Sequence, residues 1–370
     1  MTKKRVLSVF GTRPEAIKMC PLALELRRRP EFESVVCVTA QHREMLDSVL
    51  ETFRLTPDYD LDIMEPEQTR SSIPSKVLTQ LGAVLREARP DIVLVHGDTT
   101  TTFAGALAAF YQQVAIGHVE AGLRTYNKYS PYPEEMNRQF VSAMADLNFA
   151  PTEKSRENLL REGRNPESIL VTGNTAIDAM RTTVRPDYED ELTRWAAGSR
   201  LLTLTAHRRE NLGEPMHRMF RAIRRILDQY EDVKVVYPVH LNPLVQQAAR
   251  EELGGCERVR LVPPLEVIQF HNLLAHSYLI LTDSGGIQEE APSLGKPVLV
   301  LRDTTERPEG IEAGTLKLAG TEEETIYAML DQLLRDPEEY GRMSRAHNPY
   351  GDGQASRRIA DAIIRRFSRD

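Results

Sequence analysis

Short apolar runs alternate with longer amphipathic segments along most of the chain. In the first half the runs are RVLSVF, VVCVTA, IVLVHG, VAIGHV, LNFAP and ILVTGN, at residues 5–10, 35–40, 92–97, 114–119, 147–151 and 169–174. Segments of helical length, such as 21–29 and 77–89, lie between them. Continuous apolar runs separated by helices are typical of buried parallel strands, so the pattern predicts an α/β sheet covered on both faces.

A second series of apolar runs follows a charged stretch, 185–200, that has no strand pattern. These runs are RLLTLTAH, VKVVYPVH, RVRLVPP, YLILTDSGG and PVLVLRD, beginning at residues 200, 233, 258, 278 and 297. Since 370 residues exceed what one hydrophobic core usually serves, we expect two doubly wound, Rossmann-like domains that face a cleft. We place them at 1–172 and 173–353, with a helix at about 354–370 that could pack on either domain.

Composition narrows the class of protein. The formal net charge is −7, which disfavours a general nucleic-acid binder. No apolar run approaches the ~20 residues of a membrane span, and the N-terminal run has no signal-peptide core, so no membrane partner is expected. Three widely spaced cysteines contain no C-x-x-C pair, which favours a cytoplasmic protein without structural zinc or disulfides.

Polar residues follow many of the apolar runs, where ligands of such sheets usually bind. Arg13 is interpreted as an anion clamp or a surface residue beside a helix start. The 207–209 cluster, His-Arg-Arg, suits a phosphate or caps the next helix. The 283–286 turn, Asp-Ser-Gly-Gly, could hold an anion, and Glu290, one helical turn later, suits a ribose diol.

Carboxylates form a second group of candidates. Asp98 ends a strand and is either a helix N-cap or a catalytic group. Glu120 follows a strand directly, whereas Glu134 and Glu135 follow a loop and would ordinarily be solvated or support the next helix. His118, His240 and His271 could each be structural. The chain has no G-x-G-x-x-G, phosphate-loop, H-E-x-x-H, G-x-S-x-G or kinase motif, so bound NAD has no support.

Together these motifs resemble the non-hydrolysing UDP-N-acetylglucosamine 2-epimerases. The resemblance rests on FGTRPEAIKM, HGDTTTTF, HVEAGLRTYNKYSPYPEEMNRQ, VTGNT, TAHRREN, YPVHLNP, TDSGGIQEEAPSLGKPVLVLRDTTERPEG and NPYGDGQAS, in order from about residue 5 to residue 365. It implies a glycosyltransferase-B-like fold, a homodimer, no metal or cofactor, and a role in making precursors of surface polysaccharides.

The resemblance also implies roles for individual residues. The catalytic set is Asp98, Glu120, Glu134 and His207. The substrate-binding set is Arg13, Lys18, Arg208, His240, Phe270, Ser284, Gly285, Gly286, Glu290 and Arg307. In this set the serine and glycines hold the diphosphate of UDP, Glu290 takes the ribose hydroxyls and Phe270 lines the uracil pocket.

The implied reaction inverts carbon 2 of the sugar through elimination and re-addition of UDP. Two faces of the sugar need proton-handling groups, which explains several carboxylates. A glycosyltransferase, a hydrolysing epimerase that releases UDP and the free sugar, and a non-enzymatic sugar-nucleotide sensor are the alternatives.

A regulatory difference from the family is also predicted. Many relatives bind a second UDP-N-acetylglucosamine as an activator, at positions that match Gln41, Glu44, Glu67, Glu134, Arg208 and His240. Where regulated relatives carry Gln and Arg, this chain has Glu44 and Glu67. Added carboxylates repel a diphosphate, so we expect activation to be weak or absent.

Overall fold

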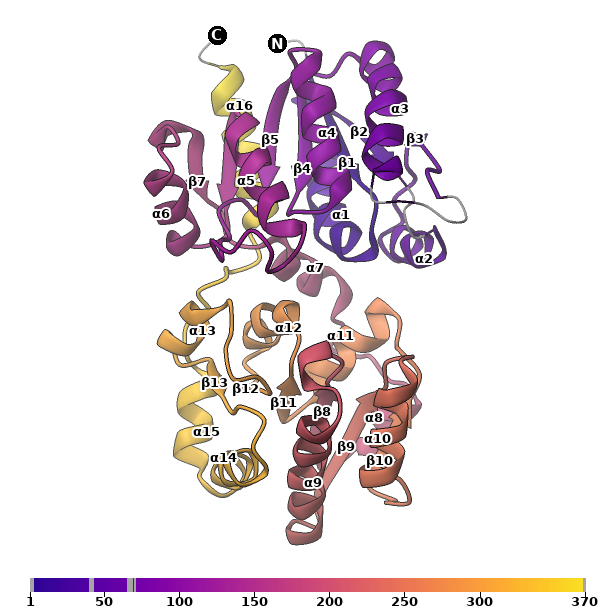
Figure 1. The fold of residues 1–370 in the computed structure, drawn as a ribbon, viewed down its shortest axis with the longest axis vertical. Coiled ribbons are helices and arrows are strands. Elements are labelled where there is room, and N and C mark those ends of the chain that lie inside the picture. The colour runs from indigo at the N-terminus through magenta and orange to yellow at the C-terminus, as the bar shows by residue number, and fades with distance from the viewer. Residues whose placement is uncertain (1–2, 40–42, 65–68, 70, 369–370) are drawn as a thin grey trace. The chain divides into compact units, whose positions relative to one another are not determined.

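The computed structural model describes residues 3–39, 43–64, 69 and 71–368, and the chain within these ranges forms two compact units (Figure 1). The first unit comprises residues 1–182 and 350–370, and the second comprises 183–349. The chain therefore crosses between units at 182/183 and again at 349/350.

The first unit contains a parallel sheet of seven strands within the described residues, in the order β3-β2-β1-β4-β5-β6-β7. The strands are β1 (Lys4–Phe10), β2 (Phe32–Val38), β3 (Tyr59–Asp60), β4 (Ile92–His96), β5 (Ala115–Val119), β6 (Leu147–Ala150) and β7 (Ile169–Val171). The helices are α1 (Arg13–Arg28), α2 (Arg43–Phe53), α3 (Ser72–Ala88), α4 (Thr100–Tyr111), α5 (Glu134–Met144), α6 (Glu153–Arg161), α7 (Thr175–Thr183, whose last residue falls in the second unit) and α16 (Ala355–Phe367).

Helices cover the first sheet because its central strands are apolar throughout. All five residues of β4 are buried, as the uninterrupted run in the sequence predicts. Helices α3, α4 and α5 pack side by side, and α1 packs with α2 and α16. The C-terminal helix thus belongs to the first unit, where Asp178 of α7 accepts hydrogen bonds from the backbone N–H groups of Ala355 (3.1 Å) and Ser356 (2.8 Å). Helix α7, which the sequence placed after the domain boundary at 172, belongs almost entirely to this unit as well.

The second unit repeats the same winding with six strands among the described residues, in the order β10-β9-β8-β11-β12-β13. The strands are β8 (Arg200–Thr205), β9 (Val233–Pro238), β10 (Val259–Val262), β11 (Leu279–Thr282), β12 (Val298–Val300) and β13 (Leu316–Leu318). The helices are α8 (Glu191–Ala196), α9 (Glu214–Gln229), α10 (Pro243–Leu253), α11 (Val267–His276), α12 (Gly285–Glu290), α13 (Pro308–Glu312), α14 (Glu323–Arg335) and α15 (Pro337–Ser344). Helix α9 packs between α10 and α14.

The strand orders fix where each unit can bind a ligand. In both sheets the winding reverses beside the first strand, between β1 and β4 in one unit and between β8 and β11 in the other. The turns that leave two such strands diverge and leave a crevice at the carboxyl edge of the sheet. The predicted α/β class with two doubly wound sheets is confirmed. Strands β3 and β13 were not predicted.

Candidate active site

The turns after β1 and β4 are tied together by a buried carboxylate that sequence reasoning missed. Glu15 is 2% exposed. Its Oε2 accepts hydrogen bonds from the backbone nitrogens of Gly11 (3.1 Å) and Thr12 (2.8 Å), and its Oε1 accepts one from Thr99 Oγ1 (2.7 Å). The T-x-x-E spacing in the sequence was the available signal, because it is the pattern of a capping box. Glu15 therefore positions the turns that carry Arg13 and Asp98.

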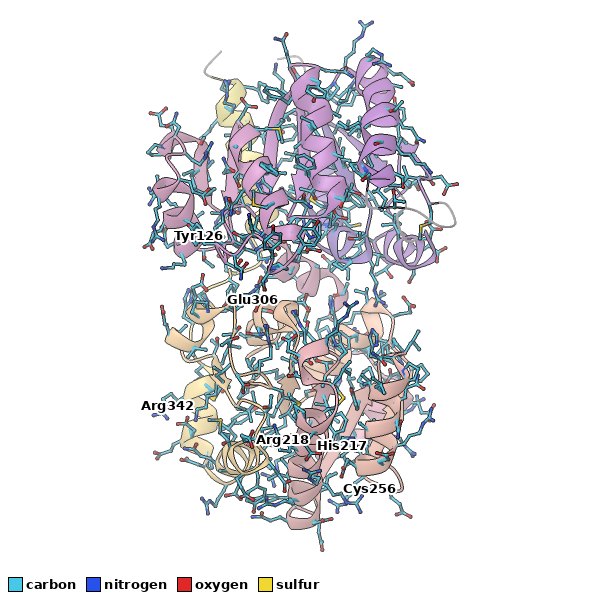
Figure 2. All side chains as sticks on the ribbon, viewed as in Figure 1. Tyr126, His217, Arg218, Cys256, Glu306 and Arg342 are labelled. Carbon is cyan, nitrogen blue, oxygen red and sulfur yellow. The ribbon has the colours of Figure 1, made fainter. Side chains whose placement is uncertain are left out.

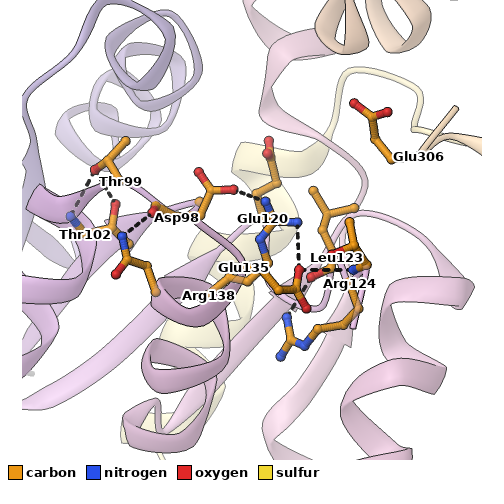
Figure 3. A network of polar contacts seen from close by, with 12 residues as sticks. Asp98, Thr99, Thr102, Glu120, Leu123, Arg124, Glu135, Arg138 and Glu306 are labelled. Carbon is orange, nitrogen blue, oxygen red and sulfur yellow. Dashed lines mark hydrogen bonds and ion pairs between the residues drawn. The ribbon is translucent and has the colours of Figure 1, made fainter. Parts of the chain in front are cut away.

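Asp98 follows Gly97, whose φ of +67° turns the chain sharply after β4. The N-cap of α4 is Thr99, which accepts a hydrogen bond from Thr102 N, so the Asp98 carboxylate does not cap this helix. It pairs instead with Arg138 of α5, which lies between Asp98 and Glu135 (Figure 3). The carboxylate is held at the carboxyl edge of the sheet by a helix from a later part of the chain.

Glu120 sits directly after β5 with a left-handed φ of +61°, an uncommon conformation for a residue other than glycine. Its Oε2 accepts hydrogen bonds from Lys18 Nζ and from Asn174 Nδ2 (3.0 Å), and His96 Nε2 lies 3.3 Å away. Burial alone would raise the pKa of Glu120, but the charges of Lys18 and His96 outweigh it and hold the pKa well below its usual range. Glu120 is therefore ionised at neutral pH.

Two neighbouring glutamates begin α5 and have different surroundings. Glu135 is fully buried and accepts hydrogen bonds from the backbone nitrogens of Thr125 and Tyr126, both at 3.0 Å. Of the two interpretations of Glu135, solvation is wrong, whereas its place in the first turn of α5 is as the other expected, and the carboxylate also fastens the preceding loop to this helix. Glu134 has a buried Oε2 without a hydrogen-bond partner among the described residues. A buried acceptor left unsatisfied is costly, which marks Glu134 as a candidate for contact with a ligand.

His118 of β5 is a structural residue. Its ring is fully buried, with Nε2 2.7 Å from the carbonyl oxygen of Gly97 and Nδ1 3.3 Å from Ser142 Oγ. Burial lowers the pKa of His118 to about 3, so the ring is neutral and Nε2 donates to the carbonyl. The bond fixes the position of Gly97, next to Asp98. His118 therefore supports the site without a role in proton transfer.

In the second unit a buried aspartate joins the turns after β8 and β11. Asp283 is fully buried, and its Oδ2 accepts hydrogen bonds from the backbone nitrogens of His207 and Arg208, both at 2.8 Å. The His207 ring stacks on His240 with centroids 5.3 Å apart. Burial, with His240 and Arg208, lowers the pKa of His207 although Asp283 opposes the shift. The His207 ring caps neither of the helices that follow, since the N-cap of the 3-10 helix Arg209–Asn211 is Arg208, without a side-chain cap hydrogen bond, and that of α9 is Gly213.

The predicted uridine contacts lie on α11, α12 and the turn before α12. Ser284 is the N-cap of α12, and Glu290 is its last residue. The Glu290 side chain is 13% exposed, with its Oε2 4.0 Å from His271 Nε2. Phe270 packs on the apolar cluster that contains Leu274, Ile280 and Ile287. The turn, Glu290 and Phe270 therefore belong to one folded unit, as the proposed uridine site requires.

Arg307 lies among acidic side chains. Its Nε donates to Glu289 Oε1 (2.6 Å), and its Nη1 lies 3.5 Å from Glu306 Oε1. Arg208 Nη2 lies 3.6 Å from the same oxygen of Glu306. Sequence reasoning identified both arginines as candidates but did not identify Glu306.

Three predicted regulatory residues have no described side chain. Gln41 and Glu67 lie outside the described residues, and so does the side chain of Glu44 in α2. The prediction about activation therefore stays a prediction. Across the described part of the chain, no three His, Cys, Asp or Glu side chains are grouped so as to hold a metal ion. In the same part, none of the helices combines the length and the apolar character needed to cross a membrane.

Two doubly wound sheets, each with ionisable side chains at its carboxyl edge, define a two-domain α/β protein with a candidate active site. A family model described as UDP-N-acetylglucosamine 2-epimerase matches residues 24–364. The UDP-N-acetylglucosamine 2-epimerase of Bacillus subtilis (strain 168) is 64% identical over 364 residues, covering 98% of this chain and 96% of the relative. This chain therefore belongs to the UDP-N-acetylglucosamine 2-epimerase family.

Solved structures agree with this assignment. A crystal structure of a UDP-N-acetylglucosamine 2-epimerase matches with a TM-score of 0.93 and 60% identity, covering 100% of this chain and 98% of the other. The enzyme from Neisseria meningitidis, solved with bound UDP-N-acetylglucosamine, matches with a TM-score of 0.89 and 48% identity, covering 98% and 100%. These matches confirm the predicted glycosyltransferase-B-like fold class.

Proposed function

We propose that this enzyme interconverts UDP-N-acetylglucosamine and UDP-N-acetylmannosamine without hydrolysing either. The observation that carries the proposal is the buried, ionised Glu120 paired with Lys18 at the carboxyl edge of the first sheet. The pairing supplies a carboxylate that can take a proton and a cation that can move to a leaving diphosphate. The Neisseria relative with bound UDP-N-acetylglucosamine supports this choice of substrate.

The carbon 2 hydrogen of the sugar is not acidified by an adjacent carbonyl, so direct deprotonation is slow. Elimination avoids this difficulty. The bond from carbon 1 to the diphosphate stretches and positive charge builds at carbon 1. A carboxylate then takes the carbon 2 proton, giving 2-acetamidoglucal and UDP. Re-addition of UDP, with a proton delivered to the opposite face of carbon 2, gives the epimer.

Asp98, Glu120 and Glu134 are the proposed proton-handling groups, and Lys18 couples Glu120 to the nucleotide. While Lys18 pairs with Glu120, the lowered pKa of Glu120 makes the carboxylate a weaker base. If the diphosphate draws Lys18 away, the pKa of Glu120 rises towards its ordinary range. Substrate binding would then activate the carboxylate.

The second unit supplies most of the proposed nucleotide contacts, and Arg13 and Lys18 of α1 add two from the first unit. Ser284, Gly285 and Gly286 present backbone groups to the diphosphate, Glu290 accepts from the ribose hydroxyls and Phe270 lies against uracil. Arg13, Lys18, Arg208 and Arg307 contribute positive charge, which stabilises a departing diphosphate. The neutral His207 ring and its stacking partner His240 contribute hydrogen-bonding groups.

Incubation with UDP-N-acetylglucosamine in deuterated water tests the proposal. We expect both UDP-sugars to appear with deuterium at carbon 2, measured by proton NMR and mass spectrometry. Release of UDP and free N-acetylmannosamine would indicate the hydrolysing class. A reaction that waits for an acceptor would indicate a glycosyltransferase, and binding without exchange would indicate a sensor.

We also propose, from the family resemblance, a cytoplasmic homodimer that makes precursors of surface polysaccharides. Exposed aromatic side chains on α4 and α5 support a second copy as the partner: Phe110 is 55% exposed, Tyr111 70% and Phe140 47%. Sedimentation velocity should show a dimer for the wild type and a monomer for Tyr111→Glu. The control Leu244→Glu, at a 58% exposed position on α10, should remain dimeric. A monomeric wild type at every concentration would contradict the proposal.

A further inference from the structure

Glu306, in the segment between β12 and α13, lies among three arginines of the second unit and is labelled in Figure 2. Its Oε2 is 2.6 Å from Arg302 Nη1, and its Oε1 is 3.5 Å from Arg307 Nη1 and 3.6 Å from Arg208 Nη2. Burial would raise the pKa of Glu306, but Arg307 and Arg302 outweigh it and lower the pKa below its ordinary value. The side chain is therefore a carboxylate at neutral pH, in contact with three cations.

The same carboxylate occupies space in front of the 284–286 turn. A Cβ atom added to Gly285 would lie 3.0 Å from Glu306 Oε1 and 3.6 Å from the guanidinium carbon of Arg307. Gly285 and two of the three arginines are the groups assigned to the diphosphate in the proposed function. An anionic oxygen of the protein thus already lies beside the backbone and the cations proposed to receive an anionic ligand.

The neighbouring charged side chains determine how easily Glu306 can leave the three arginines. Arg307 also donates to Glu289, and Arg302 Nε lies 3.4 Å from Glu210 Oε1. Glu306 is the carboxylate that reaches all three guanidinium groups, and its side chain is 29% exposed, whereas that of Glu289 is 3% exposed. Glu306 can therefore leave for solvent at lower cost than the buried glutamate, which stays with Arg307.

We propose that Glu306 competes internally with the diphosphate: it neutralises Arg208, Arg302 and Arg307 in the unliganded protein and is displaced when the nucleotide binds. This inference rests on the proposed function, and it adds a residue that sets nucleotide affinity. The negative charge of Glu306, held among the three arginines, opposes binding of the negatively charged diphosphate. When the product leaves, Glu306 takes its place beside the arginines again. Glu306 thus holds the arginines in position in the unliganded protein, and this lowers the affinity for UDP.

Calorimetric titration of UDP into the wild type and Glu306→Gln tests the competition. The substitution keeps the size of the side chain and removes its charge, so UDP should bind roughly tenfold tighter. Glu306→Asp retains the charge but withdraws it from Gly285, and should give an intermediate affinity. Asp232→Asn is the matched control, because Asp232 pairs with Arg200 through two hydrogen bonds (2.7 and 2.8 Å) just before β9, at the opposite edge of the same sheet. Its affinity for UDP should equal that of the wild type.

Inorganic pyrophosphate, titrated in parallel, tests the anion contacts without the nucleoside and should show the same order of affinities. Equal or weaker binding of UDP by Glu306→Gln would overturn the inference, since it would mean that Glu306 only positions the arginines. If that result accompanies normal deuterium exchange by the wild type, the proposed function survives it. If no variant binds UDP or pyrophosphate, both proposals fail.

Discussion

Glu120→Gln should lower the turnover of UDP-N-acetylglucosamine by roughly 10²-fold or more. The amide matches the carboxylate in size but cannot take a proton from carbon 2, and it no longer attracts Lys18. Because Lys18 and His96 are then left beside a neutral group, some stability will also be lost, and circular dichroism must show that the variant is folded. Turnover is followed by proton NMR of the two UDP-sugars.

Asp98→Asn and Glu134→Gln should lower turnover by a similar factor. The two variants differ in how much the substitution should affect the stability of the fold. Asp98 loses its ion pair with Arg138. The buried Oε2 of Glu134 has no hydrogen-bond partner among the described residues, so its replacement removes no internal bond to that oxygen. A large loss of turnover with unchanged thermal stability in Glu134→Gln would therefore be the clearest sign of a catalytic role.

Asp91→Asn provides the matched control for all three variants. Asp91 pairs with Lys4 (3.1 Å) and accepts a hydrogen bond from the backbone nitrogen of Arg5 (2.7 Å), just before β4 and thus at the opposite edge of the sheet. Its loss of charge should leave turnover near the wild-type value. Any of the three site variants that behaves like this control is excluded from proton transfer.

The sequence predicted the architecture well where strands are buried on both faces. Strand β4 begins with four consecutive apolar residues, and all five of its residues are buried, because helices cover both faces of the sheet. Strand β8 gives a similar signal from three leucines, interrupted by a buried threonine. Strands β3 and β13 gave no such signal. Each is an edge strand, of two and three residues respectively, and depends on pairing with β2 or β12 rather than on its own pattern.

The candidate site was predictable to the extent that polar residues end central strands. Asp98, Glu120 and His207 follow β4, β5 and β8, and the winding of the sheets brings such positions to one edge. The charged residues that support the site were harder to predict from the sequence, because their roles depend on partners that are distant along the chain. Glu15 bonds to Thr99 across 84 residues, and Glu306 lies beside Arg208 from another strand end. Local patterns cannot reveal such pairs.

Glu290→Ala should weaken UDP binding about 10-fold to 100-fold, because hydrogen bonds to a charged group contribute about 1.5–3 kcal/mol. Its carboxylate lies at the end of α12 and is 13% exposed. The proposed contact is with the ribose, so affinity for UMP should fall with that for UDP, while affinity for inorganic pyrophosphate should not. The control is Glu324→Ala, at an exposed glutamate of α14 that pairs with Arg225 of α9.

Arg13→Ala should give the complementary pattern in the same calorimetric titrations. The guanidinium is proposed to contact phosphate and not the nucleoside, so pyrophosphate and UDP should both bind more weakly, while uridine should be unaffected. The control is Arg156→Ala, in which the lost arginine pairs with Glu153 on the surface of α6. The two variants together assign ribose and phosphate to different residues. If Glu290→Ala weakened pyrophosphate, or if Arg13→Ala left UDP binding unchanged, the corresponding contact would be removed from the site, because each assignment predicts loss with one fragment and none with the other.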